Sequence, residues 1–167
     1  HIFEKKSEHN PISIVCSPQQ YKYITIMRDP ISRVYSYYQM SKNHSLTPGH
    51  ILAKKSLTDF LRFSWQAKNL YCQYYTGNVG EIVDREMFLK AKENLKDFFY
   101  VGDFKTYEKS FKELCSKLNI EINNIPHANT GKYESISNEE KLLIKHYNQF
   151  DVLLYNEFFK EKLNNKT

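Results

Sequence analysis

The junction between residues 21–27 and the proline that follows them constrains the fold more than any other feature of this chain. Residues 21–27 read Y-K-Y-I-T-I-M, a run of β-branched and aromatic residues that favours a β-strand. The strand stops at Arg28. Asp29 is then a good N-cap, and Pro30 suits the first helical position, where its missing N–H costs nothing. The sequence therefore predicts a strand that leads directly into a helix through Tyr38.

Apolar spacing and capping signals predict further helices downstream. Ser56-Leu57-Thr58-Asp59 and Ser137-Asn138-Glu139-Glu140 both resemble a capping box. The predicted helices cover about residues 56–65, 66–75, 87–95, 107–118 and 142–159, the last with a break near Asp151. Residues 119–132 are rich in Asn and predict a loop.

A second strand is predicted at Asp97–Gly102, a short apolar run that follows one helix and precedes another. Few strands alternating with many helices indicate an α/β fold in which a short parallel sheet is flanked by helices. The length of 167 residues suits a single domain, which we expect to span residues 1–167.

Composition narrows the class of protein. Hydrophobic residues make up 41% and charged residues 26% of the chain, as in globular proteins. No apolar run approaches the ~20 residues of a membrane helix. The cysteines, Cys16, Cys72 and Cys115, lie too far apart in sequence to indicate a zinc site or a disulfide framework, and we predict no metal. The net charge of +5 suits an anionic ligand and equally an ordinary basic surface.

The predicted junction is also a good device for binding an anion. A helix N-terminus at the carboxyl end of a parallel strand directs N–H groups and a positive dipole towards the crevice there. Arg28 supplies a bidentate fork, and Arg33 and Ser36 follow within two turns. A phosphate group is the natural ligand. The alternative is structural: Arg28 pairs with Asp29 or a distant carboxylate, and Ser36 only packs against the sheet.

The string from Arg28 to Tyr38, R-D-P-I-S-R-V-Y-S-Y-Y, resembles the R-D-P-x-x-R-x-x-S-x-Y signature of sulfotransferases that use 3'-phosphoadenosine 5'-phosphosulfate (PAPS). In that family this strand and helix bind the 3'-phosphate. The resemblance therefore implies that Arg28 and Ser36 bind it, that Arg33 supports the helix or the nucleotide, and that the fold is the P-loop-nucleotide-kinase-like sulfotransferase fold. It also implies transfer of a sulfuryl group from PAPS to a hydroxyl acceptor, with a carbohydrate as the expected acceptor.

The resemblance extends beyond this string and is strongest to the group that includes heparan sulfate 2-O-sulfotransferase and its bacterial relatives. Residues 69–77 resemble the N-x-x-x-x-Y-[LF]-x-G segment of the group, residues 91–102 its A-K-x-N-L and F-V-G block, and residues 151–155 its D-x-x-L-Y helix. Residues 127–132, H-A-N-T-G-K, stand where the family has a loop that closes over the nucleotide. This implies nucleotide contacts from Asn129, Thr130 and Lys132.

The chain departs from the family pattern at two places. Lys105 stands where a Glu follows the second strand in relatives, and residues 1–21 contain nothing like the loop that binds the phosphosulfate group upstream of the 3'-phosphate motif. Two expectations follow: the chain is an N-terminally incomplete piece of a sulfotransferase, or it is a non-catalytic module that binds nucleotides or sulfated glycans. The upstream sequence would distinguish them.

Under the first expectation, His1-Ile2-Phe3 matches the G-H-x-x-[FY] stretch of relatives, whose His is the proposed general base. His1 is then the candidate catalytic base, with His9 as a rival. An imidazole with an ordinary pKa of ~6.5 is suited to accept the proton of an attacking hydroxyl. The resemblance implies the cytoplasm for a bacterial member and the Golgi lumen for an animal one, and the sequence does not choose between them.

Nucleic-acid binding is a weaker interpretation of the basic residues. Lys54 and Lys55 form one basic run, and Lys92 and Lys96 lie near the aromatic residues 98–100. Apolar strand residues are better explained as core, and lysines at helical spacing usually form a solvated face. We therefore expect no nucleic-acid partner.

Overall fold

A computed structural model describes residues 21–122, 124–125 and 135–164 of the chain. The first half contains β1 (Ile24–Met27), α1 (Pro30–Asn43), α2 (His50–Lys55), α3 (Leu57–Phe63), the 3₁₀ turn η1 (Trp65–Ala67) and α4 (Leu70–Thr76). The second half contains α5 (Arg85–Lys96), β2 (Tyr100–Asp103), the 3₁₀ turn η2 (Phe104–Thr106), α6 (Tyr107–Lys117), α7 (Asn138–Tyr147) and α8 (Gln149–Asn164). The protein is therefore α/β and mostly helical, as predicted.

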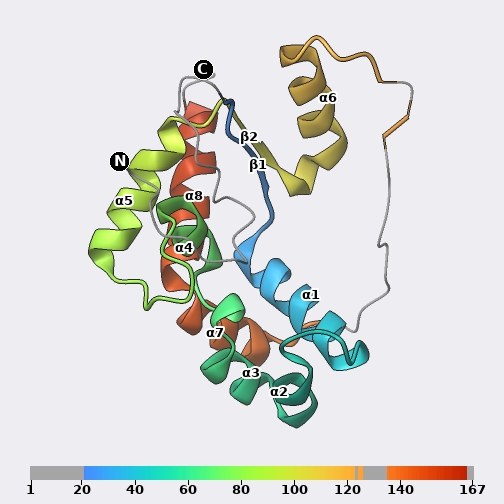
Figure 1. Cartoon of the computed structure of the whole chain (residues 1–167), viewed down its shortest axis with the longest axis vertical. Helices are drawn as coiled ribbons and strands as arrows, with labels where there is room; N and C mark the ends of the chain where they lie inside the picture. The colour runs from blue at the N-terminus through green and yellow to red at the C-terminus, as the bar shows by residue number, and fades with distance from the viewer. Residues whose placement is uncertain (1–20, 123, 126–134, 165–167) are drawn as a thin grey trace.

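The two strands form a short parallel sheet, which confirms the prediction from the strand and helix pattern. Ile24 lies opposite Tyr100 and Met27 lies opposite Asp103. In Figure 1, α4, α5 and α8 lie on one side of the strands and α6 lies on the other. Because both strands run in the same direction, their carboxyl ends meet at one edge, and the residues that follow each strand meet there too.

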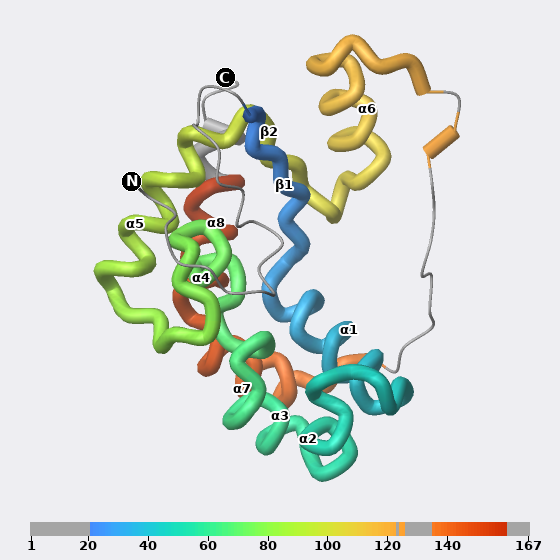
Figure 2. Tube along the Cα trace, viewed as in Figure 1, coloured from blue at the N-terminus to red at the C-terminus, as the bar shows by residue number. Residues whose placement is uncertain are grey.

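Two groups of buried side chains form the core. The first joins both strands to α4, α5 and α8, and the second joins α1, α2 and α3 to α7. The tube in Figure 2 shows that α1 leads from the sheet towards α2, α3 and α7. Representative members of the first group are Met27, Cys72, Ala91, Val101 and Leu154, and of the second Val34, Ala53, Phe60, Leu61 and Ile144. Helix α1 thus connects the sheet to a separate helical layer.

Capping side chains begin the helices at the predicted places. The Asp29 carboxylate accepts a hydrogen bond of 2.8 Å from the Ser32 N–H, and Pro30 is the first residue of α1. Ser137 and Glu140 form a complete capping box at α7. At α3 only half of the box is present: the Ser56 hydroxyl accepts from the Asp59 N–H and donates to the Asp59 carboxylate. The predictions at α1 and α7 are confirmed, and the one at α3 is correct for its first half.

The structure differs from the predicted helices in three places. The predicted helix 66–75 is divided, because Asn69 adopts a left-handed conformation (φ 43°) between η1 and α4. The long C-terminal helix was predicted to break near Asp151, and it breaks at Asn148, three residues earlier. Helix α2 was not predicted, because it is short and Gly49 precedes it without a capping side chain.

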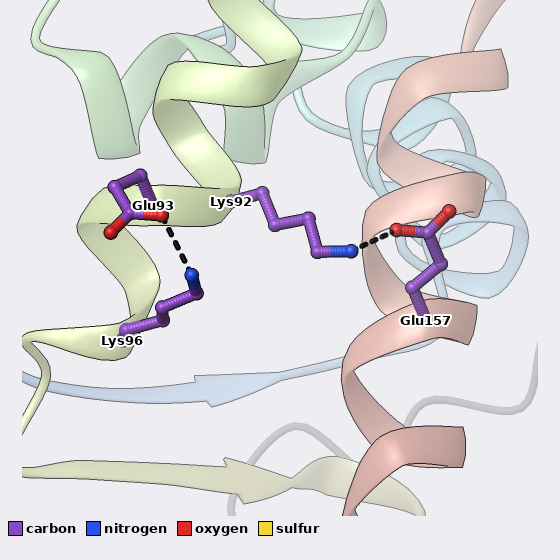
Figure 3. Close-up of polar contacts among 4 residues, drawn as sticks. All are labelled: Lys92, Glu93, Lys96 and Glu157. Atoms are coloured by element: carbon purple, nitrogen blue, oxygen red, sulfur yellow. Dashed lines mark hydrogen bonds and ion pairs between the residues drawn. The ribbon is translucent and has the colours of Figure 1, made fainter.

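Side chains of α5 connect it to both neighbouring helices. The Lys92 ammonium lies 2.7 Å from the Glu157 carboxylate of α8 (Figure 3). The Asn94 amide donates a hydrogen bond of 2.7 Å to the Tyr75 carbonyl near the end of α4. Lys96, by contrast, pairs with Glu93 of its own helix. The residues of the A-K-x-N-L string therefore have structural partners.

Helix α6 packs closely against β2 because Gly102 has no side chain. A Cβ at Gly102 would lie 2.9 Å from the Ser110 Cβ, which is too close for a real contact. The Ser110 hydroxyl accepts from the Asp103 N–H and donates to the Asp103 carbonyl. Among the residues that the structure describes, no helix is both long and apolar enough to cross a membrane.

Candidate anion-binding site

A pocket of about 380 Å³ opens beside the carboxyl end of β1 and the first turns of α1. Its volume lies in the range of small-molecule pockets, roughly 300–1,000 Å³. Three segments contribute to it: the junction after β1, helix α1, and the segment that enters α7. The lining residues are Arg28, Asp29, Ile31, Ser32, Tyr35, Ser36, Ser135, Ile136 and Lys141.

The lining of this pocket is mostly apolar, and hydrogen-bond donors predominate among its polar groups. Arg28 and Lys141 are cations, and Ser36 and Ser135 carry hydroxyls that can donate. Among the described lining residues, Asp29 carries the only carboxylate, and its Oδ1 accepts from both the N–H and the hydroxyl of Ser32, each at 2.8 Å. Guanidinium, ammonium and hydroxyl groups around a helix N-terminus favour an anion such as phosphate or sulfate.

Arg28 is held at the edge of the sheet through its backbone. The Tyr71 hydroxyl accepts a hydrogen bond of 2.8 Å from the Arg28 N–H and donates one of 2.9 Å to the Arg28 carbonyl. The Arg28 guanidinium carbon lies 5.2 Å from the ring centre of Phe104, which follows β2. Both strand ends therefore contribute to the environment of Arg28.

Arg33 lies outside this pocket, although the same string of sequence contains it. Its Nη1 donates to the Gln66 carbonyl at 3.2 Å, and its Nη2 lies 3.5 Å from the Asn148 side-chain oxygen. Its guanidinium carbon is 5.4 Å from the ring centre of Tyr71. The structure thus places Arg33 between α1, η1 and the junction of α7 with α8.

A buried polar cluster lies next to Arg33 and supports Tyr71. The Asp151 carboxylate accepts hydrogen bonds of 2.9 Å from the backbone N–H groups of Tyr71 and Cys72, which are the first turn of α4. Burial raises the pKa of Asp151, while the Arg33 charge and the two N–H donors act in the opposite direction. Burial also raises the pKa of the Tyr71 hydroxyl, so this hydroxyl stays protonated at neutral pH.

A second polar contact marks the end of β2. The Tyr155 hydroxyl donates a hydrogen bond of 2.8 Å to the Asp103 carboxylate, and the same oxygen accepts from the Lys105 N–H at 2.9 Å. Burial, followed by the Asp103 carboxylate, raises the pKa of Tyr155. The acidic side chain of Asp103 therefore lies at the carboxyl end of β2. Lys105 occupies the position at which the sulfotransferases that this sequence resembles have Glu.

The predicted site residues divide into three groups. Arg28 and Ser36 line one pocket, and Arg33 lies apart from them. His1, His9, Asn129, Thr130 and Lys132 lie outside the described residues. The sequence interpretation missed Ser135 and Lys141 as lining residues, and it did not connect Tyr71 with Arg28. Tyr71 lies within the quoted 69–77 segment, but no local signal connects it to Arg28.

The other interpretations of the sequence can be compared with the structure as well. Lys92 and Lys96, considered above as a nucleic-acid surface, each form an ion pair with a glutamate. Across the part of the chain that the structure describes, no three His, Cys, Asp or Glu side chains are grouped as metal ligands would be.

Comparison with known proteins gives no independent assignment. No protein-family model, no curated protein and no solved structure matches this chain.

Proposed function

We propose that this chain is a PAPS-dependent sulfotransferase domain with the sulfotransferase fold, and that the pocket beside α1 binds the 3'-phosphate of PAPS. One observation carries the proposal: Arg28 and Ser36, the residues that the signature string singles out, line the same pocket at the end of β1. Lys141 adds a second cation from a helix far away in the sequence. This arrangement suits a phosphate dianion.

The proposed ligand fits the chemistry of the pocket. The Arg28 fork can bind two phosphate oxygens, Lys141 adds a point charge, and the Ser36 hydroxyl adds a neutral donor. The N-terminus of α1 adds a favourable dipole. In the proposed family, Asn129, Thr130 and Lys132 would close over the nucleotide. The described residues thus bind and orient the donor through its 3'-phosphate.

The proposed reaction is transfer of a sulfuryl group to a hydroxyl, with a carbohydrate as the proposed acceptor. The acceptor oxygen forms a bond to sulfur while the bond from sulfur to the 5'-phosphate oxygen breaks, which releases adenosine 3',5'-bisphosphate. The proton of the acceptor passes to a base, for which His1 is the candidate. Arg, Lys and N–H donors can stabilise the charge that develops on the leaving 5'-phosphate, so we propose a reaction without a metal. The 3'-phosphate pocket of the described residues does not supply these donors, which in the proposed family come from the phosphosulfate loop.

A thermal-shift titration with adenosine 3',5'-bisphosphate tests the binding step. At 100 times its Kd, the ligand is expected to add about 2.7 kcal/mol of stability, a shift of roughly 5–10 °C for a chain of this size. Adenosine 5'-monophosphate, which lacks the 3'-phosphate, should give a much smaller shift. Arg28→Ala should abolish the difference between the two nucleotides.

Arg62→Ala is the matched control, because Arg62 also lies against an aromatic ring but does not line the pocket. It should bind like the unaltered chain. Equal shifts from both nucleotides, or full binding by Arg28→Ala, would refute the proposed 3'-phosphate site. If the upstream sequence contains no phosphosulfate loop, binding without transfer of labelled sulfate from PAPS to a panel of oligosaccharides would instead identify a non-catalytic binding module.

A further inference from the structure

We infer that Tyr71 is a positioning residue that orients Arg28 towards the bound anion. This inference rests on the proposed function, since it concerns the same pocket. Tyr71 itself does not line the pocket. It acts through the backbone of Arg28, to which its hydroxyl is bonded twice.

The Tyr71 hydroxyl provides backbone hydrogen bonds at the point where the pairing between the two strands ends. The register between the strands ends with Met27 opposite Asp103, so Arg28 is the first residue after the ladder. There the Tyr71 hydroxyl bonds both the N–H and the carbonyl of Arg28, as a neighbouring strand would. One side chain thus fixes both peptide groups that flank the Arg28 Cα, and with them the direction in which its side chain leaves the backbone.

Tyr71 is itself held from three directions. Its backbone N–H donates to the Asp151 carboxylate, its ring stacks on Tyr75 with 5.9 Å between centroids, and the Arg33 guanidinium lies over it. The ring of Tyr71 therefore connects the backbone N–H and carbonyl of Arg28 to the buried polar cluster between α4 and α8. Such support is what a precise anion site requires.

Tyr75 provides a natural control for this inference. It lies one turn further along α4, its ring is nearly parallel to that of Tyr71, and its hydroxyl also reaches β1, with 3.1 Å to the Thr25 hydroxyl. Thr25 lies in the middle of the paired strand, away from the pocket. Tyr71→Phe and Tyr75→Phe therefore remove the same atom from similar surroundings, but only the first removes contacts to Arg28.

Calorimetric titration of the full chain with adenosine 3',5'-bisphosphate tests the inference. Tyr71→Phe is expected to raise the Kd for this nucleotide roughly 3- to 10-fold, which corresponds to the net free energy of about one hydrogen bond. Tyr75→Phe should bind like the unaltered chain. In the Arg28→Ala background, Tyr71→Phe should cause no further loss, because a residue that acts through Arg28 has nothing left to position.

An NMR spectrum of the arginine side-chain Nε–H groups, recorded without ligand, gives a second measure. Arg28→Ala identifies the Arg28 signal, which Tyr71→Phe should shift or broaden and Tyr75→Phe should leave unchanged. Unchanged affinity with an unchanged Arg28 signal, or the same loss of affinity in the Arg28→Ala background, would overturn the inference. Failure of the unaltered chain to bind the nucleotide would refute the proposed function, and the Arg28 signal would still decide whether Tyr71 positions this residue.

Discussion

Asn69 and Asp151 cap two helices reciprocally. Asn69, which precedes α4, caps α8, and Asp151, which belongs to α8, caps α4. The Asn69 side-chain oxygen accepts from the N–H groups of Phe150 and Asp151 at 3.1 and 3.2 Å, near the start of α8. The Asp151 carboxylate accepts from the N–H groups of Tyr71 and Cys72 at the start of α4. This exchange satisfies four N–H groups that the two helices leave open. It also fixes the position of Tyr71 and, through it, of Arg28.

Replacement of Asp151 by Asn should destabilise the fold by about 1–3 kcal/mol, because the amide offers only one acceptor oxygen and leaves one buried N–H without a partner. Urea unfolding monitored by circular dichroism measures this loss. Asp84→Asn is the control, since Asp84 caps α5 from an exposed position and Asn caps equally well. Equal stability of the two variants would contradict the importance of the Asp151 bonds.

Two substitutions of Asn69 separate its backbone role from its capping role. Asn69→Gly keeps the left-handed conformation accessible but leaves the N–H groups of Phe150 and Asp151 without their acceptor, at a cost of about 1–3 kcal/mol. Asn69→Ala removes the cap and also strains the backbone, which adds about 1–2 kcal/mol. The free energy of unfolding should therefore fall from the unaltered chain to the Gly variant and again to the Ala variant. An Ala variant as stable as the Gly variant would show that the backbone conformation contributes nothing.

The Lys92–Glu157 ion pair should contribute only slightly to the free energy of unfolding, but its contribution should exceed that of the Lys96–Glu93 pair. The side chains of the first pair are 34% and 35% exposed and connect two helices, whereas those of the second are 62% and 66% exposed within one helix. A double-mutant cycle with alanine should give a coupling of about 0.2–1 kcal/mol for the first pair, falling as salt is added. Coupling that does not change with salt would argue against an ion-pair contribution.

High pH should unfold the protein through its buried tyrosines. Burial raises the pKa of Tyr71, Tyr75 and Tyr155, and raises that of Tyr100 to about 12. Between the ordinary value of ~10 and these higher values, the unfolded chain binds fewer protons than the folded chain. The free energy of unfolding is therefore expected to fall as pH rises through this window.

Tyrosinate absorbance during an alkaline titration measures this effect. In urea all tyrosines should ionise together, whereas in the folded protein a late group should ionise only as the helical circular dichroism is lost. Tyr155→Phe should remove one late group. Complete ionisation of the folded protein at the same pH as in urea, with the helical signal intact, would contradict the expectation.

Much of the local structure was predictable, because it depends on residues that are adjacent in the chain. Asp29 and Pro30 predicted the start of α1, and the pattern of strands and helices predicted a parallel sheet. Arg28 and Ser36 were selected from the sequence and share the pocket. The side chain of Arg33 could not be placed in this way, since it turns towards oxygen acceptors from Gln66 and Asn148 that only the fold brings near.

The sequence by itself determined which segments form the two strands and most of the helices, although both strands begin three residues later than predicted. It also led to the prediction of an anion site at Arg28 and Ser36. Only the tertiary structure decided which groups close the helix ends and what holds Arg28. The bonds from α4 to Asp151 join residues 79 and 80 positions apart, and those from Tyr71 to Arg28 span 43 positions. Hydrogen bonding of this kind depends on packing of apolar helix faces elsewhere, and no local pattern encodes which distant partner the packing will bring within reach.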